Sequence, residues 1–549
     1  MEATGSDNKK TSATSETVSE VRHDKEAQVE VGDKATLHRV LTERQVAMMA
    51  LVGTFGTGFF LASGKVLATG GPAGALISYT LIGTVSYAML ASLAEMAAFA
   101  PIPGGFITYA TRWLHPAAGF ALGWMVVLYM GAGAAGEVVA TSVLVSYWDD
   151  NFARHQAAYI TAFTVAVAAI HLSGLRVFGI FEYYSGIIKV LFMLGLLLMG
   201  VVVNLGGVPN HDRLGFRYWR DPGAFAPFLF AGAKGRFLGW FTTLPWSAYS
   251  YVGIEAIGIA VAEVQHPRRA IPRAIRSVFA RIACFYILGI LLVGTLVPYT
   301  EPRLLSHTGT GAQSPWVIAL SSAGLRGWPS VANAFFLLYS FSACNTALYV
   351  GSRALHALAM RGHAPRLFAL TQGGRPWVAN LALTAFLPLA YMAVSAGAAT
   401  VFGWFLNITA LTSFITWLII ALTYLRFRAA CTAQNVPEMA RPYRHRGQPV
   451  LAAWTAGWST VVILANGWFV FIKGNWRTAD FVVRYVNVAV MAALVFFYLV
   501  WKRPGGFVPL KDLDLWSGRR EEEEEEGEER EEVKKKDWRR VVRVVHACF

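Results

Sequence analysis

Long apolar runs separated by short charged connectors are the feature that most limits how this chain can fold. Crossing about 30 Å of hydrocarbon takes about 20 helical residues. By length and apolarity we expect about twelve membrane spans, at residues 45–67, 73–100, 117–147, 157–178, 180–205, 236–263, 277–299, 329–355, 376–398, 400–425, 450–473 and 481–502. The sequence therefore predicts an all-α polytopic membrane protein.

Composition agrees with this fold class and limits the partners. Charged residues make up 15% of the 549 residues, whereas a soluble protein carries roughly a quarter. The formal net charge is +14, but the arginines stand beside the predicted spans. There they set orientation and contact anionic lipid headgroups, so membrane lipid and not nucleic acid is the expected partner.

Arginine placement predicts the orientation. Clusters stand in three connectors on one side, at residues 265–277, 356–375 and 426–449, whereas the connector "SAGAAT" on the other side has none. A basic loop after the fifth span is the exception, and loop length weakens the rule. Both termini are therefore predicted to be cytoplasmic.

The two ends of the chain differ from its body. Residues 1–40 are polar and predict a disordered tail rather than a signal peptide. The C-terminal end carries an acidic block followed by a basic one and predicts a solvated tail. Cys548, the penultimate residue, is a candidate for acylation at the membrane surface. The four cysteines have no metal-ligand spacing, so no metal or disulfide framework is expected.

The first predicted span is interrupted by glycines at "GTFGTGFF", Gly53 to Phe60. A phosphate-binding loop would need GxxxxGK[ST] after a strand, and that spacing and context fail, as they do for dinucleotide binding. Two interpretations remain: close helix packing through small residues, or a helix that unwinds at Gly53–Gly58. Unwinding would expose backbone N–H groups that suit a carboxylate, and carbonyls that suit an ammonium group or a cation.

A matching interruption five spans later favours the second interpretation, because an inverted repeat puts two broken helices in corresponding positions. The sixth predicted span reads "LPWSAYSYVGIEAIGIAVAEV", in which Pro245, Ser247, Ser250 and Gly253 precede Glu255 at mid-membrane. In lipid, exposed backbone is tolerated only around a cavity. The two segments together predict a substrate site between them.

Ionisable side chains inside apolar runs mark functional sites by default, because a charge at mid-membrane is costly. Glu137 lies deep in the third span, Glu255 in the sixth and Lys189 in the fifth. The alternatives are a structural ion pair for Glu137 and snorkelling to an interface for Lys189. Glu95, near the end of the second span, is expected to serve a cytoplasmic gate or packing. No sodium-site pattern stands out, so protons are the predicted coupling ion, carried by Lys189, Glu255 or Glu137.

Several long motifs match one known family. They include "GTFGTGFFLASGKVLATGGPAG" in the first span, "EMAAFAPIPGGFITYATRWLHPAAGFALGW" between spans two and three, "AEVQHPRRAIPRAI" after span six, "ALYVGSRALHALAMRGHAPRLF" in and after span eight, and "DLDLWSGRR" beyond the last span. On these motifs the chain, from about Leu37 to Arg520, closely resembles the fungal amino-acid permeases, the yeast amino acid transporter family of the amino acid–polyamine–organocation superfamily.

The resemblance implies a LeuT-like bundle of twelve helices. It would contain two inverted five-helix repeats at 45–205 and 236–425, two extra helices at 450–502, and discontinuous spans one and six. The permease domain would cover residues 41–503, followed by the charged tail 504–549, where trafficking or ubiquitylation partners could bind. The implied activity is proton-driven uptake of amino acids across the plasma membrane, without a cofactor.

The resemblance also implies how a substrate is held. Its carboxylate would meet the N–H groups of Thr57 and Gly58, and its ammonium group would meet carbonyls of both broken segments. Tyr249 or Tyr251 would cap it from one side. The predicted substrate-binding residues are Thr54, Phe55, Gly56, Thr57, Gly58, Tyr249, Ser250, Tyr251, Val252, Gly253 and Asn407.

The sequence departs from the family pattern where it could reshape this pocket. Ile254 stands where threonine is common, and Gly403 where a polar residue is common. A nutrient sensor of the same fold is the alternative function, although the short polar N-terminal tail argues against it. An intramembrane enzyme is not expected, because His171 stands alone in span four and no nucleophile or metal constellation accompanies it.

Overall fold

The computed structural model describes residues 56–208, 212–260, 275, 277–305 and 313–517. These residues form helices, and their only pairing of strand type is an isolated bridge between Gln372 and Arg375. The longer helices are α3 (Ser63–Phe99), α5 (Pro116–Val145), α6 (Phe152–Ser173), α7 (Leu175–Asn204), α8 (Gly232–Thr242), α12 (Leu288–Leu296), α15 (Trp328–Met360), α18 (Ala398–Ala433), α19 (Val450–Ala465) and α20 (Thr478–Lys502). Shorter pieces join them, among them α4 (Gly105–Tyr109), α9 (Leu244–Tyr249), α10 (Ala256–Ala260), α14 (Pro315–Ser322), α16 (Trp377–Thr384) and α17 (Met392–Ala396).

Ten helical stretches of the described residues are long and apolar enough to cross a membrane. The predicted spans one and two share one stretch, Gly58–Phe99. The predicted span six does not count as one, because it is divided into α8, α9 and α10 and its last residues lie outside the described part. A polytopic helical membrane protein is confirmed, whereas the number twelve stays a prediction.

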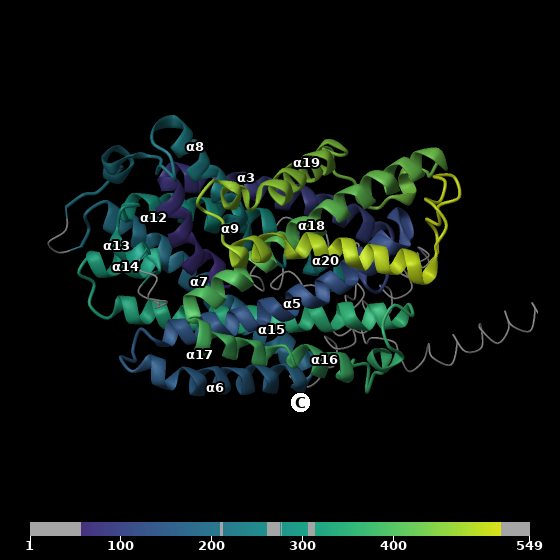
Figure 1. Ribbon diagram of the computed structural model, residues 1–549, viewed down its shortest axis with the longest axis horizontal. Coiled ribbons are helices and arrows are strands. Elements are labelled where there is room, and N and C mark those ends of the chain that lie inside the picture. Colours follow the sequence, from purple (N-terminus) through teal and green to yellow (C-terminus); the bar gives the residue numbers. More distant parts are fainter. Residues whose placement is uncertain (1–55, 209–211, 261–274, 276, 306–312, 518–549) are drawn as a thin grey trace, which may run out of the picture.

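Helices α5 and α15 form the centre of the molecule and pack along each other (Figure 1). Small residues let α5 approach its neighbours: a methyl group on Gly136 would lie 2.9 Å from Cβ of Phe405 in α18. The hydroxyl oxygen of Ser340 in α15 lies 2.8 Å from the backbone oxygen of Glu137 in α5. The centre is therefore joined by close backbone approach and by buried polar contacts.

The stretch from Gly58 to Phe99 is bent sharply at Gly71. This residue has φ +72° and ψ 174°, and Pro72 follows it. A methyl group on Gly71 would lie 2.6 Å from the backbone nitrogen of Ala226. The bend divides the stretch close to the predicted boundary between spans one and two, and it packs against the loop that precedes α8.

The polypeptide between α9 and α10 is not helical. Residues 250–255 form consecutive turns, and Gly253 has φ +84°. The hydroxyl of Tyr286 donates to the free carbonyl of Ser250 at 2.6 Å. The backbone freed by these turns therefore finds a partner within the protein, as backbone buried in a membrane must.

The outer helices present apolar side chains outward. Leu191 and Leu198 of α7 and Phe496 of α20 are each more than 60% exposed. Exposed apolar side chains of this kind suit contact with hydrocarbon.

The chain after α20 folds back onto the ends of other helices. We call residues 504–517 the C-terminal strap. Arg112 forms an ion pair with Asp514 at 2.8 Å, and the indole of Trp113 donates to the Asp514 carbonyl at 2.9 Å. Gln434, just after α18, donates to the carbonyl of Leu513 at 2.7 Å. The strap therefore joins the connector after α3 to the end of α18.

The carboxylate of Glu95 lies at the same end of the molecule. It accepts hydrogen bonds from the hydroxyl of Tyr424 and from the backbone N–H of His445, both at 2.6 Å. These bonds join α3, α18 and the connector before α19. Residues 1–40 and 518–549, including Cys548, lie outside the described part of the chain.

Candidate functional site

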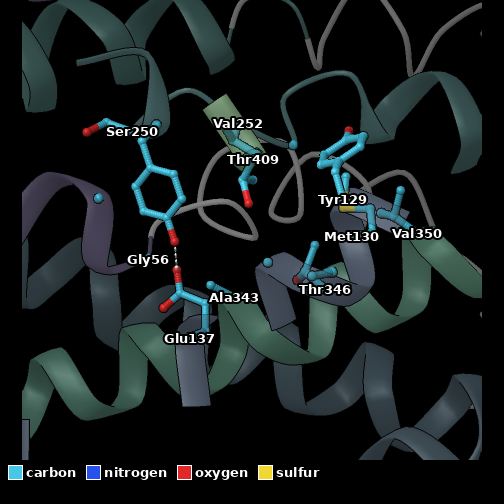
Figure 2. Close-up of a pocket in the computed structure, with 15 residues that line it drawn as sticks. Gly56, Tyr129, Met130, Glu137, Ser250, Val252, Ala343, Thr346, Val350 and Thr409 are labelled. Atoms are coloured by element: carbon cyan, nitrogen blue, oxygen red, sulfur yellow. Dashed lines mark hydrogen bonds between the residues drawn. The ribbon is translucent and has the colours of Figure 1, made fainter. Parts of the chain in front are cut away.

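A pocket lies between the beginning of the first helical stretch, at Gly56 and Gly58, and the non-helical turns after α9, and helices α5, α15 and α18 complete its wall (Figure 2). Figure 2 shows Glu137 pointing into it from one side and Tyr129 lying toward the other. Its lining residues are Gly56, Gly58, Tyr129, Met130, Gly133, Glu137, Tyr249, Ser250, Val252, Gly253, Ala343, Thr346, Ala347, Val350 and Thr409. Six of these, Gly56, Gly58, Tyr249, Ser250, Val252 and Gly253, belong to the predicted substrate-binding set.

Glu137 connects both interrupted segments across this pocket. The hydroxyl of Thr57 donates to its two carboxylate oxygens at 3.1 and 3.2 Å, and the hydroxyl of Tyr249 donates to Oε1 at 3.3 Å. Ser340 donates to Oε2 at 2.8 Å. Three hydroxyl donors reduce the cost of burying this carboxylate.

Close contacts explain why the first segment has glycine at Gly56 and Gly58. A methyl group on Gly56 would lie 2.6 Å from Oε1 of Glu137. One on Gly58 would lie 2.7 Å from Cδ1 of Tyr249 and 3.1 Å from the backbone of Ser250. Glycine is therefore needed for the first segment to meet the carboxylate and the sixth segment at these distances. A π-helical turn, Gly58–Ala62, begins directly afterwards and leads into α3.

Glu255 is completely buried beside the pocket. Its Oε1 accepts from the hydroxyl of Tyr129 at 2.5 Å, and its Oε2 accepts from the indole of Trp417 at 3.2 Å. Tyr129 lines the pocket, so this carboxyl is one side chain away from it.

Lys189 is completely buried between α7 and α15. Its ammonium group donates to the hydroxyl of Ser342 at 2.6 Å, and this hydroxyl lies 2.7 Å from each carboxylate oxygen of Glu182. Glu182 was not predicted. It stands in "FEYYSG", beside the polar end of the fifth span, where a carboxylate is unremarkable, and its partner Ser342 is 160 residues away.

Other predicted residues lie outside the pocket lining. The hydroxyl of Tyr251 donates to the carbonyl of Tyr79 at 2.7 Å, away from the pocket. The amide of Asn407 donates to the carbonyl of Gly403 at 2.7 Å, whereas Thr409, two residues later on α18, faces the cavity. Thr54 and Phe55 lie outside the described residues.

No group of three or more His, Cys, Asp or Glu side chains in the described part of the chain is arranged to hold a metal ion. The pocket instead offers hydroxyl groups, backbone of the two interrupted segments and one buried carboxylate. This donor set suits a small polar molecule that carries both an anionic and a cationic group.

Comparison with known proteins identifies the family. A family model for amino acid permeases matches residues 45–505. The dicarboxylic amino acid permease of Saccharomyces cerevisiae is 37% identical over 464 residues, which cover 83% of this chain and 76% of the relative. The basic amino-acid permease of the same yeast is 35% identical over 90% of this chain and 87% of the relative. The proline-specific permease of Emericella nidulans is 36% identical over 90% of each chain. The chain therefore belongs to the amino acid permease family.

Proposed function

We propose that this protein takes up amino acids across the plasma membrane together with protons, by alternating access to the pocket between the interrupted segments. The observation that carries the proposal is the position of Glu137, whose carboxylate accepts hydrogen bonds from Thr57 of the first segment and Tyr249 of the sixth. A carboxylate held in this way joins the two parts of the chain that would move.

The substrate would lie where both segments leave their backbone available. Its carboxylate would bind the N–H groups of Thr57 and Gly58, at the start of the helical stretch, where the helix dipole favours an anion. Its ammonium group would bind carbonyls of Tyr249, Ser250 and Val252, in and beside the turns 250–255. The fold proposed for this mechanism has twelve spans, with two inverted five-helix repeats and two extra helices.

Lys189 would bind the coupled proton, with Glu137 and Glu255 as the other groups whose protonation changes during the cycle. The support is that all three are buried within the bundle, that Glu137 lines the pocket, and that Glu255 accepts a hydrogen bond from Tyr129 of the lining. Buried ionisable groups change protonation readily when the water around them changes.

Uptake by purified protein in lipid vesicles tests the proposal. Wild-type protein should accumulate at least one labelled amino acid above its outside concentration when the outside is acidic, and a protonophore should abolish this accumulation. Lys189→Met should lose the accumulation. A full panel of the common amino acids without any concentrative uptake would contradict the proposal and favour the alternative function, an amino-acid sensor of the same fold.

A further inference from the structure

Glu182 is a buried carboxylate that the proposed mechanism leaves without a role. It lies on α7 and is 3% exposed. Its two carboxylate oxygens are each 2.7 Å from the hydroxyl of Ser342 on α15. The same hydroxyl oxygen is 2.6 Å from the ammonium nitrogen of Lys189. One hydroxyl group thus lies within hydrogen-bond distance of a buried amine and a buried carboxylate.

The hydrogen bonds of this bridge have one consistent direction. The ammonium group can only donate, so the oxygen of Ser342 must accept from Lys189. The single hydroxyl proton of Ser342 is then free to point at Glu182, whose ionised carboxylate can only accept. A hydroxyl that accepts on one side and donates on the other is arranged to pass a proton.

Glu182 lies nearer than Lys189 to the beginning of α7. Glu182 precedes Lys189 by seven residues, which is about 10 Å along a helix with a rise of 1.5 Å per residue. The beginning of α7 lies at the connector that follows α15, where the guanidinium of Arg375 donates to the carbonyl of Ser173 at 3.4 Å. That arginine-rich connector is expected to be cytoplasmic, so Glu182 lies on the cytoplasmic side of Lys189.

Further polar groups lie near Lys189 or on the helix that it contacts. Glu137 on α5 interacts electrostatically with the ammonium group. The hydroxyl of Tyr339 on α15 donates to the backbone oxygen of Lys189 at 2.5 Å. Ser340, which binds Glu137, and Ser342, which binds Glu182, are two residues apart on α15 and so point to nearly opposite sides of that helix. Helix α15 therefore presents one serine to each carboxylate.

We propose that Glu182 is a second proton-binding site, which receives the coupled proton from Lys189 through the hydroxyl of Ser342 and releases it toward the cytoplasm. In the transfer an N–H bond of Lys189 breaks as its proton binds the Ser342 oxygen. The original hydroxyl proton moves to the Glu182 carboxylate. Lysine becomes a neutral amine, glutamate a neutral acid, and serine is a hydroxyl again. This inference rests on the proposed proton-coupled uptake.

A purely structural role for Glu182 would have a different effect on transport. A carboxylate that serves only to hold α7 against α15 would affect every transport mode alike, because each needs the same folded bundle. A proton acceptor on the release path is needed for net uptake, in which a proton must leave on the inside. It is not needed for exchange of internal for external substrate, in which the protonated carrier can return loaded.

The test compares these two modes in vesicles that contain Glu182→Gln or Ser342→Ala protein. Glutamine keeps the shape of the side chain but cannot take up the proton. We expect net uptake driven by a pH gradient to fall at least about tenfold, since a positioned proton acceptor typically contributes about 10²–10⁴-fold to a transfer rate. Exchange of labelled for unlabelled substrate at equal pH should stay within about twofold of wild type by the same reasoning.

Conservative and matched variants complete the test. Glu182→Asp and Ser342→Thr keep an acid and a hydroxyl and should retain part of the net uptake. Ser86→Ala removes another buried hydroxyl, one that donates to the carbonyl of Gly83 in its own helix, and should leave both modes unchanged. Glu301→Gln changes a carboxylate in a loop between helices and should also leave them unchanged.

The outcomes separate the two proposals. If wild-type protein shows no proton-driven accumulation, the proposed function fails whatever Glu182 does. If wild type accumulates substrate and Glu182→Gln does so equally, or loses net uptake and exchange to the same extent, the second proton site is wrong. If Glu182→Gln protein does not fold, Ser342→Ala decides by the same comparison.

Discussion

Gly58 illustrates how little space separates the two interrupted segments. A methyl group there would lie 2.7 Å from the ring of Tyr249 and 3.1 Å from the backbone of Ser250. The ring can move but the backbone of the turn cannot move freely, so we expect Gly58→Ala to reduce uptake at least about tenfold and to destabilise the protein by about 1–3 kcal/mol. Initial uptake rates normalised to surface protein measure the first effect.

Gly195→Ala is the matched control for this prediction. Gly195 lies on α7, and no atom lies within 4 Å of the position that its methyl group would take. Uptake by this variant should equal that of wild type. Normal uptake by Gly58→Ala would show that the close approach is not needed for the pocket.

Removal of the Tyr129 hydroxyl should have a measurable effect on stability. It donates to Glu255 at 2.5 Å, while Trp417 binds the other oxygen. Tyr129→Phe removes one donor from a completely buried carboxyl and should cost about 1–3 kcal/mol. A lower melting temperature in detergent measures this loss. Tyr184→Phe, at an exposed position, should leave the melting temperature unchanged.

At the scale of single residues, the sequence identified ionisable side chains that are costly to bury in apolar runs. Glu137, Glu255 and Lys189 stand inside apolar runs, so their presence alone marked them, and all three are buried. Glu137 lines the pocket, and Glu255 accepts a hydrogen bond from Tyr129 of the pocket lining. Glu182 could not be recognised, because its significance depends on contact with Ser342. Asn407 and Thr409 differ by two helix positions, which is about half a turn, and the sequence does not state which face of a helix is turned inward.

The corner at Gly71 decides how the first long helical stretch folds back. Its φ of +72° and ψ of 174° belong to a region that residues with side chains rarely adopt, at a cost of about 1–3 kcal/mol. A methyl group would also lie 2.6–2.8 Å from backbone atoms of residues 224–226. Gly71→Ala should therefore lower stability by more than the backbone cost alone, as measured by thermal unfolding in detergent.

Gly215→Ala separates the backbone cost of a positive φ from the cost of close contacts. Gly215 also has a positive φ, of 55°, but no atom lies within 4 Å of the added methyl group. This variant should lose only the backbone contribution. Equal losses in the two variants would mean that contact with residues 224–226 does not matter at the corner.

Among the elements, the sixth segment has turns at residues 250–255, where serine and glycine in mid-span weaken a helix. The matching break predicted in the first span, at Gly53–Gly58, falls mostly outside the described residues. The division of the preceding part into α8 and α9 was not foreseen, because an apolar run of the right length predicts one continuous helix. The turn at Thr243 depends on contacts elsewhere in the bundle: its hydroxyl lies 2.7 Å from that of Ser78 on α3.

For the whole molecule, the C-terminal strap connects parts of the chain that lie about 400 residues apart in sequence. An exposed ion pair such as Arg112–Asp514 contributes only about 0–1 kcal/mol by itself, but the Asp514 side chain also accepts from the N–H groups of Trp516 and Ser517 at 3.2 and 3.0 Å. We expect Asp514→Ala to increase trypsin cleavage after Lys511, detected by mass spectrometry.

The same contact predicts how the strap responds to pH. Partial burial acts to raise the pKa of the Asp514 carboxyl, but hydrogen bonds from Ser517 and Trp516 and the charge of Arg112 hold it below its usual value of 3.8. A carboxyl whose pKa is lowered by folding stabilises the folded form above its unfolded pKa, and this stabilisation is lost as the pH falls through the folded pKa. Protection of Lys511 should therefore be constant between about pH 5 and 8 and decrease only in stronger acid. A decrease near pH 6 would show that another group controls the strap.

The strap also shows a limit of reading composition. Leu513 and Leu515 are 3% and 0% exposed, whereas the acidic and basic blocks for which a solvated tail is predicted lie beyond the strap, outside the described residues. Two apolar residues in a short segment give no periodic pattern, and their burial depends on a surface built by distant helix ends. The membrane spans, by contrast, were predictable because hydrocarbon thickness alone sets their length.

Because residues 504–517 are part of the folded body, the place at which a label is attached to this protein matters. A fluorescent protein or affinity tag fused after Ser517 would leave the strap in its seat against Trp113 and Gln434. A tag that replaces everything after the last helix would remove the strap itself and expose the apolar surface that it covers. Localisation or purification results obtained with the second kind of fusion would describe a different molecule.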